Sequence, residues 1–379
     1  DALNKKYDLE RKFAAMVAKD ANLKATYGGV LEKIKSHYAE GKKYLMARSM
    51  IIEFYFVGPE ILRFTQGFNK VAENWEQLSK DGKLNDEIER LRSLVDRFYK
   101  NYQPFVDEQV LGALYPMYIE ALAPNLRPDI HSSLSSKYGT DWQRMAKETF
   151  AKSAFTSRDR LNALLDKLKS KGGAKKIQKD PAYKLGKSVF AAWRQKAAPS
   201  FAAFDAELSK MMRVYVKGLM TLFPDRRYWP DANSTLRLSY GQIEGSEPRD
   251  GVVYNAFTTL DGVLAKYVPG DREFDLPEKL IRLGKTRDYG QYADKEGNLP
   301  VCFTASNHTT GGNSGSPVLD GYGRLIGINF DRSWESTMSD IMYDPERCRN
   351  IIVDIRYVLF IVDKYAGATH LIKEMEIVK

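Results

Sequence analysis

The 379 residues are enough for one or two domains with a sizeable core. With 43% hydrophobic and 28% charged residues, the composition is ordinary for a soluble globular protein, and the absence of any run of about 18 apolar residues excludes a membrane-spanning helix. The formal net charge of +9 arises in residues 1–230, which hold 41 basic and 27 acidic residues, whereas residues 231–379 hold 17 and 22.

Residues 1–229 are predicted to form an α-helical domain. In Leu84–Phe98 the apolar positions step by four and three residues, which is typical of one face of an amphipathic helix. The segment from Phe201 to Leu219 repeats this pattern. Paired glycines, many lysines and a final proline in Lys169–Pro181 predict an internal loop.

The basic surface of this domain has more than one interpretation. A solvated, lysine-rich helical face is the simplest one. A positive surface also attracts nucleic acid, an anionic surface or acidic peptides. No zinc-finger spacing or aromatic-plus-glycine motif supports nucleic acid, so we expect no nucleic-acid partner.

After the connector Leu222–Ser234 the pattern changes to that of strands. Alternation of Leu236, Leu238 and Tyr240 predicts one strand, and four further segments are candidates: 251–260, 299–305, 316–330 and 350–358. Within 316–330 the turn sequence DGYG separates two apolar runs and predicts a hairpin. The fold class is therefore α+β: residues 230–379 are expected to form one six-stranded antiparallel β-barrel, half of a double barrel, with a C-terminal helix.

Metal and cofactor sites are not expected. The two cysteines, Cys302 and Cys348, have no metal-ligand spacing. Whether they form a disulfide or two free thiols stays open at this point.

The stretch TTGGNSGSPVLD, Thr309–Asp320, has the features of a nucleophile loop. Serine is a weak nucleophile and must be exposed and oriented to react. Glycines on both sides of Ser314 permit an unusual turn that presents its hydroxyl, and the N–H groups of Gly312 and Ser314 can converge on an oxyanion. A glycine-rich hairpin connection without chemistry is the alternative, but Pro317 and the following strand favour the nucleophile.

The segment from about Val301 to Met375, and TTGGNSGSPVLDGYGRLIGINFDRSWESTMSDI above all, resembles the bacterial dipeptidyl-peptidase 7 and 11 family. Those serine exopeptidases have a chymotrypsin-like catalytic fold with a large helical insertion, and they remove dipeptides from peptide N-termini. The helical first part agrees with that insertion in architecture rather than in motif.

The resemblance implies roles for three side chains. Ser314 would be the nucleophile, and Asp331 would hold the free α-amino group of the substrate, a task that suits a carboxylate. Arg332 stands where the dipeptidyl-peptidase 11 branch has arginine and the other branch has glycine. A guanidinium binds carboxylates bidentately, so we expect Asp or Glu as the second residue of the released dipeptide. An ordinary solvated Asp–Arg pair is the alternative.

A catalytic histidine and aspartate are missing from the pattern. In chymotrypsin-like enzymes both precede the serine, on the first barrel. His37, His131, His308 and His370 have no matching context, and His308 lies in the serine loop itself, whereas a base must approach from the opposite side. We therefore expect a C-terminal fragment that begins inside the helical insertion and is inactive alone.

The expected partners are peptides with a free N-terminus, the missing N-terminal half and, through the exposed inter-barrel surface, a second copy in a homodimer. The start of the chain carries no signal-peptide pattern. By resemblance the location would be the periplasm or cell surface of a bacterium.

Two other functions stay open. One is a dipeptidyl peptidase for hydrophobic residues, with Arg332 pointing to solvent. The other is a non-catalytic peptide-binding module with a degenerate peptidase tail.

Overall fold

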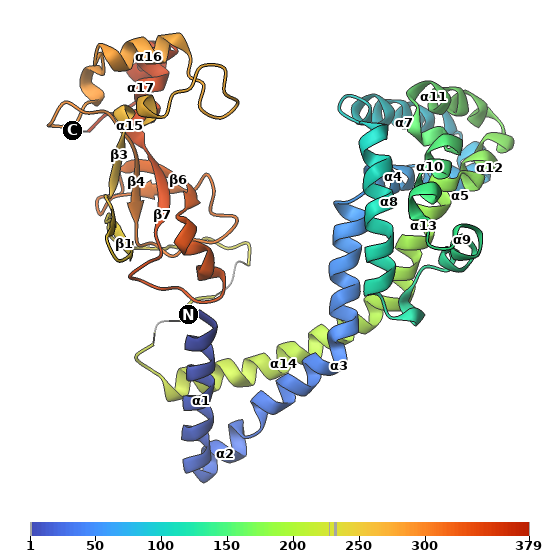
Figure 1. Cartoon of the computed structure of the whole chain (residues 1–379), viewed down its shortest axis with the longest axis horizontal. Helices are drawn as coiled ribbons and strands as arrows, with labels where there is room; N and C mark the ends of the chain where they lie inside the picture. The colour runs from blue at the N-terminus through green and yellow to red at the C-terminus, as the bar shows by residue number, and fades with distance from the viewer. Residues whose placement is uncertain (1, 227, 231–232, 379) are drawn as a thin grey trace. The chain divides into compact units, whose positions relative to one another are not determined.

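Helices fill nearly all of residues 2–222, and the first strand begins only at Ser246 (Figure 1). This computed structural model describes residues 2–226, 228–230 and 233–378. The chain divides into two units, one of residues 15–226 and one of residues 1–14 with 227–379. No helix of the described residues is long and apolar enough to cross a bilayer.

Helices follow one another along the first 220 or so residues, as the apolar periodicity predicts. The helices up to the connector are α1 (Ala2–Lys19), α2 (Ala21–Tyr27), α3 (Val30–Met50), η1 (Ile51–Phe56), α4 (Glu60–Gln66), α5 (Asn69–Glu73), α6 (Trp75–Lys80), α7 (Leu84–Phe98), α8 (Pro104–Ala121), η2 (Pro124–Leu126), α9 (Ile130–Tyr138), α10 (Trp142–Lys152), η3 (Ala154–Thr156), α11 (Arg158–Asp166), η4 (Lys167–Lys169), α12 (Lys171–Lys179), α13 (Pro181–Ala192), η5 (Trp193–Ala197) and α14 (Ala198–Leu222).

Most of the helices pack around one apolar core. The predicted stripe of α7 is confirmed, because Ile88, Leu91 and Val95 are buried in that core. Phe98 from the same stripe stacks on Phe64 of α4, with ring centroids 3.7 Å apart. Apolar burial on this scale is the main stabilising contribution to such a unit.

The predicted loop at 169–181 is wrong, because most of it is the helix α12. Glycine pairs lower helix propensity, but here one of them has a packing reason. A Cβ at Gly173 would overlap the backbone carbonyl of Lys167, so only glycine lets α12 begin this close to η4.

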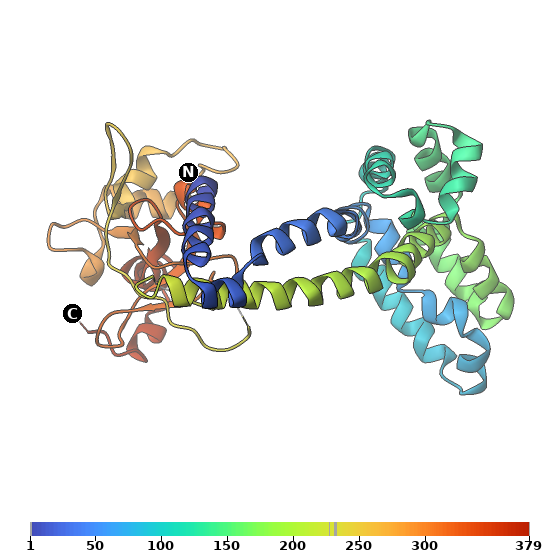
Figure 2. The ribbon, with the colours of Figure 1, turned by 90° about the horizontal axis from the view of Figure 1, so that it is seen from below.

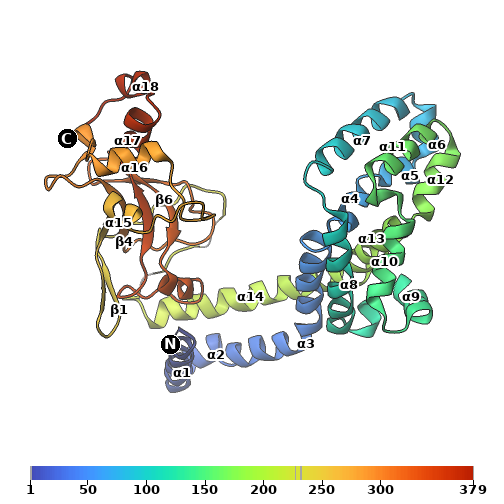
Figure 3. The same cartoon turned by 45° about the horizontal axis from the view of Figure 1, so that its top comes forward.

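The long helices α3 and α14 run side by side (Figures 2 and 3). Phe204 of α14 is buried against Gly41 of α3, where a Cβ would overlap the phenyl ring. His37 stacks on the same ring at a centroid distance of 4.5 Å, and its Nε2 lies 2.9 Å from the Phe204 carbonyl oxygen. A glycine and an aromatic ring therefore fix how these two helices meet.

The second unit contains two antiparallel sheets. Its elements are β1 (Ser246–Arg249), β2 (Val252–Tyr254), β3 (Phe257–Thr259), α15 (Leu260–Ala265), α16 (Glu278–Lys285), η6 (Gly290–Tyr292), β4 (Pro300–Ala305), β5 (Pro317–Leu319), β6 (Leu325–Arg332), η7 (Trp334–Asp340), β7 (Asn350–Asp354), α17 (Ile355–Phe360), η8 (Ile361–Tyr365) and α18 (Thr369–Lys373). The strand order of the larger sheet is β3-β4-β7-β6-β5, and β1 pairs with β2. Helices α15, α16 and α17 gather at one end of the sheet (Figure 1), where Leu260, Leu283 and Phe360 form a core of their own.

The hairpin predicted at DGYG is confirmed, since β5 pairs with β6 across it. Asp320 closes this turn by accepting hydrogen bonds from the N–H groups of Tyr322 and Arg324. The turn thus sets β6, the strand that carries the predicted specificity residues, directly beside the strand that follows Ser314.

The predicted six-stranded barrel is not confirmed: the larger sheet of the described residues has five strands, with β3 and β5 as edges. The predicted strand around Leu236, Leu238 and Tyr240 is wrong. Leu236 and Leu238 are 102% and 88% exposed, and the chain there makes no strand, although Glu244 N–H donates to the Thr304 carbonyl farther on. Alternation marks which side chains share a face, but a strand also needs a neighbouring edge to pair with.

Candidate functional site

The loop that presents Ser314 is shaped by two glycines in the left-handed half of backbone space. Gly312 has φ +101° and Gly315 has φ +84°, conformations that other residues adopt only with strain. A Cβ at either glycine would meet no atom within 4 Å, so backbone conformation and not crowding requires glycine there. The loop is closed on itself by the Asn313 side chain, whose Oδ1 accepts from Thr310 N–H at 3.0 Å.

The hydroxyl of Ser314 lies at the surface, as a nucleophile must. Ser314 is exposed, and its Oγ donates a 3.2 Å hydrogen bond to the carbonyl oxygen of Phe330. Hydrogen bonds among the described residues use the amides of Asn313 and Gly315 but not those of Gly312 and Ser314. Within the described residues, these two N–H groups thus remain available as donors.

Two buried asparagines, which sequence reasoning missed, hold this loop on the sheet. Asn329 of β6 donates from Nδ2 to the Asn313 carbonyl oxygen at 3.3 Å, and its Oδ1 accepts from Asn350 Nδ2 of β7 at 2.8 Å. The backbone of Asn329 also bonds Gly315 N–H and Ser316 O. An amide between Ile328 and Phe330 in an apolar run was the signal that could have found this site.

A β-bulge near the end of β6 decides which face of the sheet Asp331 and Arg332 each take. Asn329 pairs with Ile352 and Asp331 with Ile351, so Phe330 is the extra residue. Directly opposed residues share a face, and Arg332, which pairs with Asn350, therefore joins Asn329 on the inner face. Asp331 is exposed on the other face, where its Oδ1 accepts from Arg332 N–H at 2.8 Å.

Ser314 thus lies next to the end of β6, whereas Asp331 and Arg332 lie on opposite faces of that strand. The Ser314 hydroxyl contacts the carbonyl oxygen of the residue directly before Asp331. Arg332 does not point freely into solvent: its guanidinium meets Asp340 and Ser339 of η7. Sequence reasoning did not identify Asp340, because only the tertiary fold brings it to Arg332.

None of the histidines contacts Ser314. The ring of His308 packs against Trp229 and Tyr343, with centroid distances of 4.9 and 5.0 Å. Its Nε2 is buried and has no hydrogen-bond partner within the described part of the chain. Burial lowers the pKa of His308, so its ring is neutral at physiological pH. His37 and His131 lie in the helical unit, and His370 is exposed on α18.

The cysteines offer no alternative nucleophile. Cys302 and Cys348 are both free thiols. Burial raises the pKa of each thiol, which disfavours the reactive thiolate. Across residues 2–226, 228–230 and 233–378, no group of His, Cys, Asp or Glu has the arrangement of a metal site.

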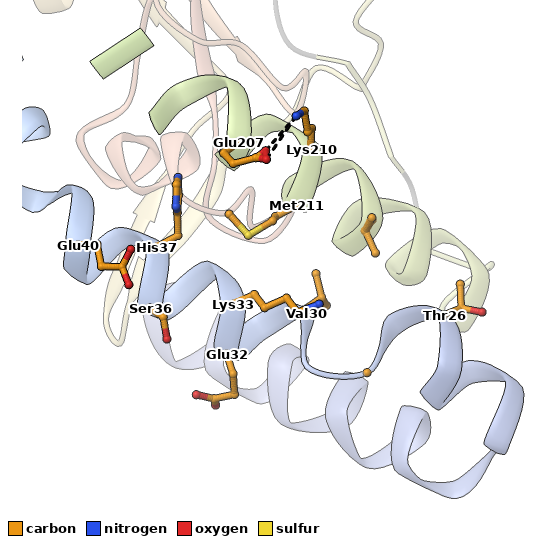
Figure 4. Close-up of a pocket in the computed structure, with 12 residues that line it drawn as sticks. Thr26, Val30, Glu32, Lys33, Ser36, His37, Glu40, Glu207, Lys210 and Met211 are labelled. Carbon is orange, nitrogen blue, oxygen red and sulfur yellow. Dashed lines mark hydrogen bonds and ion pairs between the residues drawn. The ribbon is translucent and has the colours of Figure 1, made fainter. Parts of the chain in front are cut away.

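A separate hollow of about 630 Å³ lies in the helical unit (Figure 4). Its lining combines apolar residues such as Val30 and Met211 with the charged pair Glu207–Lys210, whose carboxylate and ammonium are 3.1 Å apart. Residues from α3 and α14 face each other across it. It contains none of the predicted site residues, and no buried charge marks it as a site of chemistry.

Comparison with known proteins points to one family of peptidases. The model of the peptidase S46 family matches residues 1–377. An Asp/Glu-specific dipeptidyl-peptidase of Flavobacterium psychrophilum is 39% identical over 378 residues, which cover 100% of this chain and 52% of that protein. Dipeptidyl-peptidase 7 of Porphyromonas gingivalis is 38% identical over 379 residues, 100% of this chain and 51% of that protein.

The fold gives the same result. A crystal structure of Porphyromonas endodontalis DPP11 in complex with substrate superposes with a TM-score of 0.85 at 33% identity, and the match covers 98% of this chain and 52% of that one. The chain thus spans about half the length of the relatives that it matches. On this agreement of sequence and fold, the chain belongs to the peptidase S46 family.

Proposed function

We propose that this chain is part of a serine dipeptidyl peptidase that releases N-terminal dipeptides with Asp or Glu in the second position. Ser314 is the nucleophile, and the N–H groups of Gly312 and Ser314 stabilise the oxyanion. Asp331 binds the α-amino group of the substrate, and Arg332 binds its acidic side chain. The relative from Flavobacterium psychrophilum is an Asp/Glu-specific dipeptidyl-peptidase, which supports this substrate class.

One observation carries the proposal. An exposed serine hydroxyl, on a loop bent by two positive-φ glycines, contacts the carbonyl group directly before an Asp–Arg pair. Nucleophile, amine-binding carboxylate and guanidinium therefore lie on neighbouring parts of one hairpin. This order matches the needs of an exopeptidase, which must hold a charged N-terminus at a fixed distance from the bond that it cleaves.

The five-stranded sheet is proposed to belong to the second barrel of a chymotrypsin-like domain. The catalytic histidine and aspartate would come from a preceding half, so the isolated chain is expected to be inactive. A homodimer, and a periplasmic or cell-surface location, complete the proposal as expectations.

The test is an assay of a full-length protein that carries this chain, with dipeptidyl-Asp, dipeptidyl-Glu and dipeptidyl-Leu reporters. We expect hydrolysis of the acidic reporters and at least a 10³-fold loss of kcat in Ser314→Ala, the usual scale for removing a nucleophile. Undiminished activity in Ser314→Ala would refute the assignment of the nucleophile.

The second candidate is a dipeptidyl peptidase for hydrophobic residues, favoured by the similarity to dipeptidyl-peptidase 7. That alternative had Arg332 in solvent, whereas its side chain is only 23% exposed and ion-paired. A preference for dipeptidyl-Leu that persists in Arg332→Ala would favour this alternative. A non-catalytic peptide-binding module would bind peptides with a free N-terminus and hydrolyse none of the reporters.

A further inference from the structure

The guanidinium of Arg332, which the proposed function assigns to the acidic side chain of the substrate, is already paired with Asp340. Its Nη1 and Nη2 donate to the two carboxylate oxygens of Asp340, each at 2.7 Å. This is a bidentate pair, the geometry by which arginine also recognises a carboxylate ligand. Nη1 additionally donates to Ser339 Oγ at 3.2 Å. The two N–H donors that would bind an incoming Asp or Glu side chain are thus already bound to the carboxylate of Asp340.

The two partners differ in how firmly they are held. Arg332 belongs to β6, is paired with Asn350 of β7, and has a side chain that is 23% exposed. Asp340 is the last residue of the short helix η7, and its side chain is 55% exposed. For a surface side chain at a helix end, a change of rotamer and the loss of an exposed ion pair cost little free energy. An exchange of carboxylates would therefore move Asp340 and leave Arg332 in place.

Asp340 carries a full negative charge when a substrate arrives. The hydrogen bonds from Arg332 hold the pKa of Asp340 below its ordinary value, so it stays ionised at neutral pH. It then competes with a substrate carboxylate on equal chemical terms. A neutral substrate residue faces no such competition, because the Arg332–Asp340 pair can stay intact beside it.

We propose that Asp340 is a resident competitor: it neutralises Arg332 in the free enzyme, and the Asp or Glu side chain of the substrate displaces it. This inference rests on the proposed function and adds a residue that lowers the affinity for acidic substrates. Removal of the competing charge leaves the guanidinium unpaired and open. Acidic substrates can then pair with Arg332 without displacing Asp340, so their affinity rises, whereas the affinity for neutral substrates stays the same.

The test compares Asp340→Asn with the wild type in the full-length protein, using dipeptidyl-Glu and dipeptidyl-Leu reporters. We expect KM for the Glu reporter to fall about 3- to 10-fold, the scale of a partly exposed ion pair, with kcat little changed. KM for the Leu reporter should stay within about 2-fold. Glu335→Gln is the matched control, because Glu335 lies on the same helix η7 and is not a partner of Arg332.

Two results would overturn the inference. A rise in KM for the Glu reporter would mean that Asp340 positions Arg332 for the substrate. An equal fall in KM for both reporters, or a fall also in Glu335→Gln, would mean a general effect of charge. Asp340→Glu, which keeps the carboxylate, should return KM toward the wild-type value.

Arg332→Ala separates this inference from the proposed function. If Arg332→Ala abolishes the preference for Glu over Leu while Asp340→Asn leaves KM unchanged, only the competitor role fails. If Arg332→Ala leaves that preference intact, the assignment of Arg332 itself fails. Melting temperatures of all variants show whether each is folded.

Discussion

The side-chain amide of Asn350 donates a 2.8 Å hydrogen bond to Oδ1 of Asn329, and the two residues are only 3% and 5% exposed. Buried amides need such partners, because an unsatisfied polar group costs about 1–3 kcal/mol. Asn329 in turn donates from Nδ2 to the carbonyl oxygen of Asn313, one residue before Ser314. The serine loop is therefore held by the interior of the sheet as well as by its own turn.

Asn329→Ala is expected to lower the free energy of unfolding of the β unit by about 1–3 kcal/mol, because it leaves the buried side-chain amide of Asn350 without its hydrogen-bond acceptor. In the full-length enzyme it should also lower kcat, since the loop loses its tether. Denaturant unfolding and reporter hydrolysis measure the two effects. Asn255→Ala is the control, since Asn255 is exposed, and it should change neither quantity. An Asn329→Ala variant as stable and active as that control would contradict the tether.

Gly312→Ala should disturb the serine loop through its backbone. At φ +101° an alanine carries strain of about 1–2 kcal/mol, although the added methyl group meets no atom. We expect at least a 10-fold loss of kcat, because the N–H at residue 312 is the proposed oxyanion donor. Gly311→Ala is a close control, since Gly311 lacks a positive φ and also has open space. Equal losses in both variants would show that flexibility, and not this φ, is what matters.

Much of the fold could be predicted from local pattern. The α7 stripe and the DGYG hairpin depend on residues that are neighbours in sequence, so periodicity and turn chemistry were sufficient. The glycines around Ser314 belong to the same class, because their φ values are a local property. Prediction failed where packing decided the conformation. Gly173 lies in a helix at a place where a side chain would overlap the Lys167 carbonyl, and Leu236 lies outside any strand.

The residues of the candidate site also fall into two groups, those that local sequence predicts and those that only the tertiary fold brings in. Ser314, Gly312, Asp331 and Arg332 follow from one contiguous motif, whereas Asn350 and Asp340 reach the site only through strand pairing and the path of η7. The bulge at Phe330 decides which face Arg332 takes, and alternation alone would have placed it on the other face. A residue that acts through tertiary contact leaves no periodic signal in the chain.

Gly41→Ala should destabilise the helical unit even though alanine is the better helix former. The added Cβ would overlap the Phe204 ring, and overpacking of this kind costs about 1–3 kcal/mol. The double variant with Phe204→Ala should lose less stability than the sum of the two single variants, because the added Cβ no longer meets a ring. A double-mutant cycle in denaturant measures this difference. Gly262→Ala in α15 has open space at the same atom and should gain about 0.5–1 kcal/mol. Additive losses in the double variant would show that residues 41 and 204 do not oppose each other.

Glu148 should make the helical unit sensitive to acid. Hydrogen bonds from Lys137 and then Lys152 lower the pKa of Glu148 to about 2, from an ordinary value of 4.5. Because the folded-state pKa is the lower one, this carboxylate stabilises the fold above pH 4.5, and the contribution disappears as the pH falls toward 2. The melting temperature of Glu148→Gln should therefore lie below that of the wild type at pH 7, with a difference that shrinks steadily between pH 4.5 and pH 2. High salt should shrink the difference at pH 7 as well, because the pairs are partly exposed and screened. A difference in melting temperature that stayed constant from pH 7 to pH 2 would mean that Glu148 acts by packing and hydrogen-bond shape, with no share for its charge.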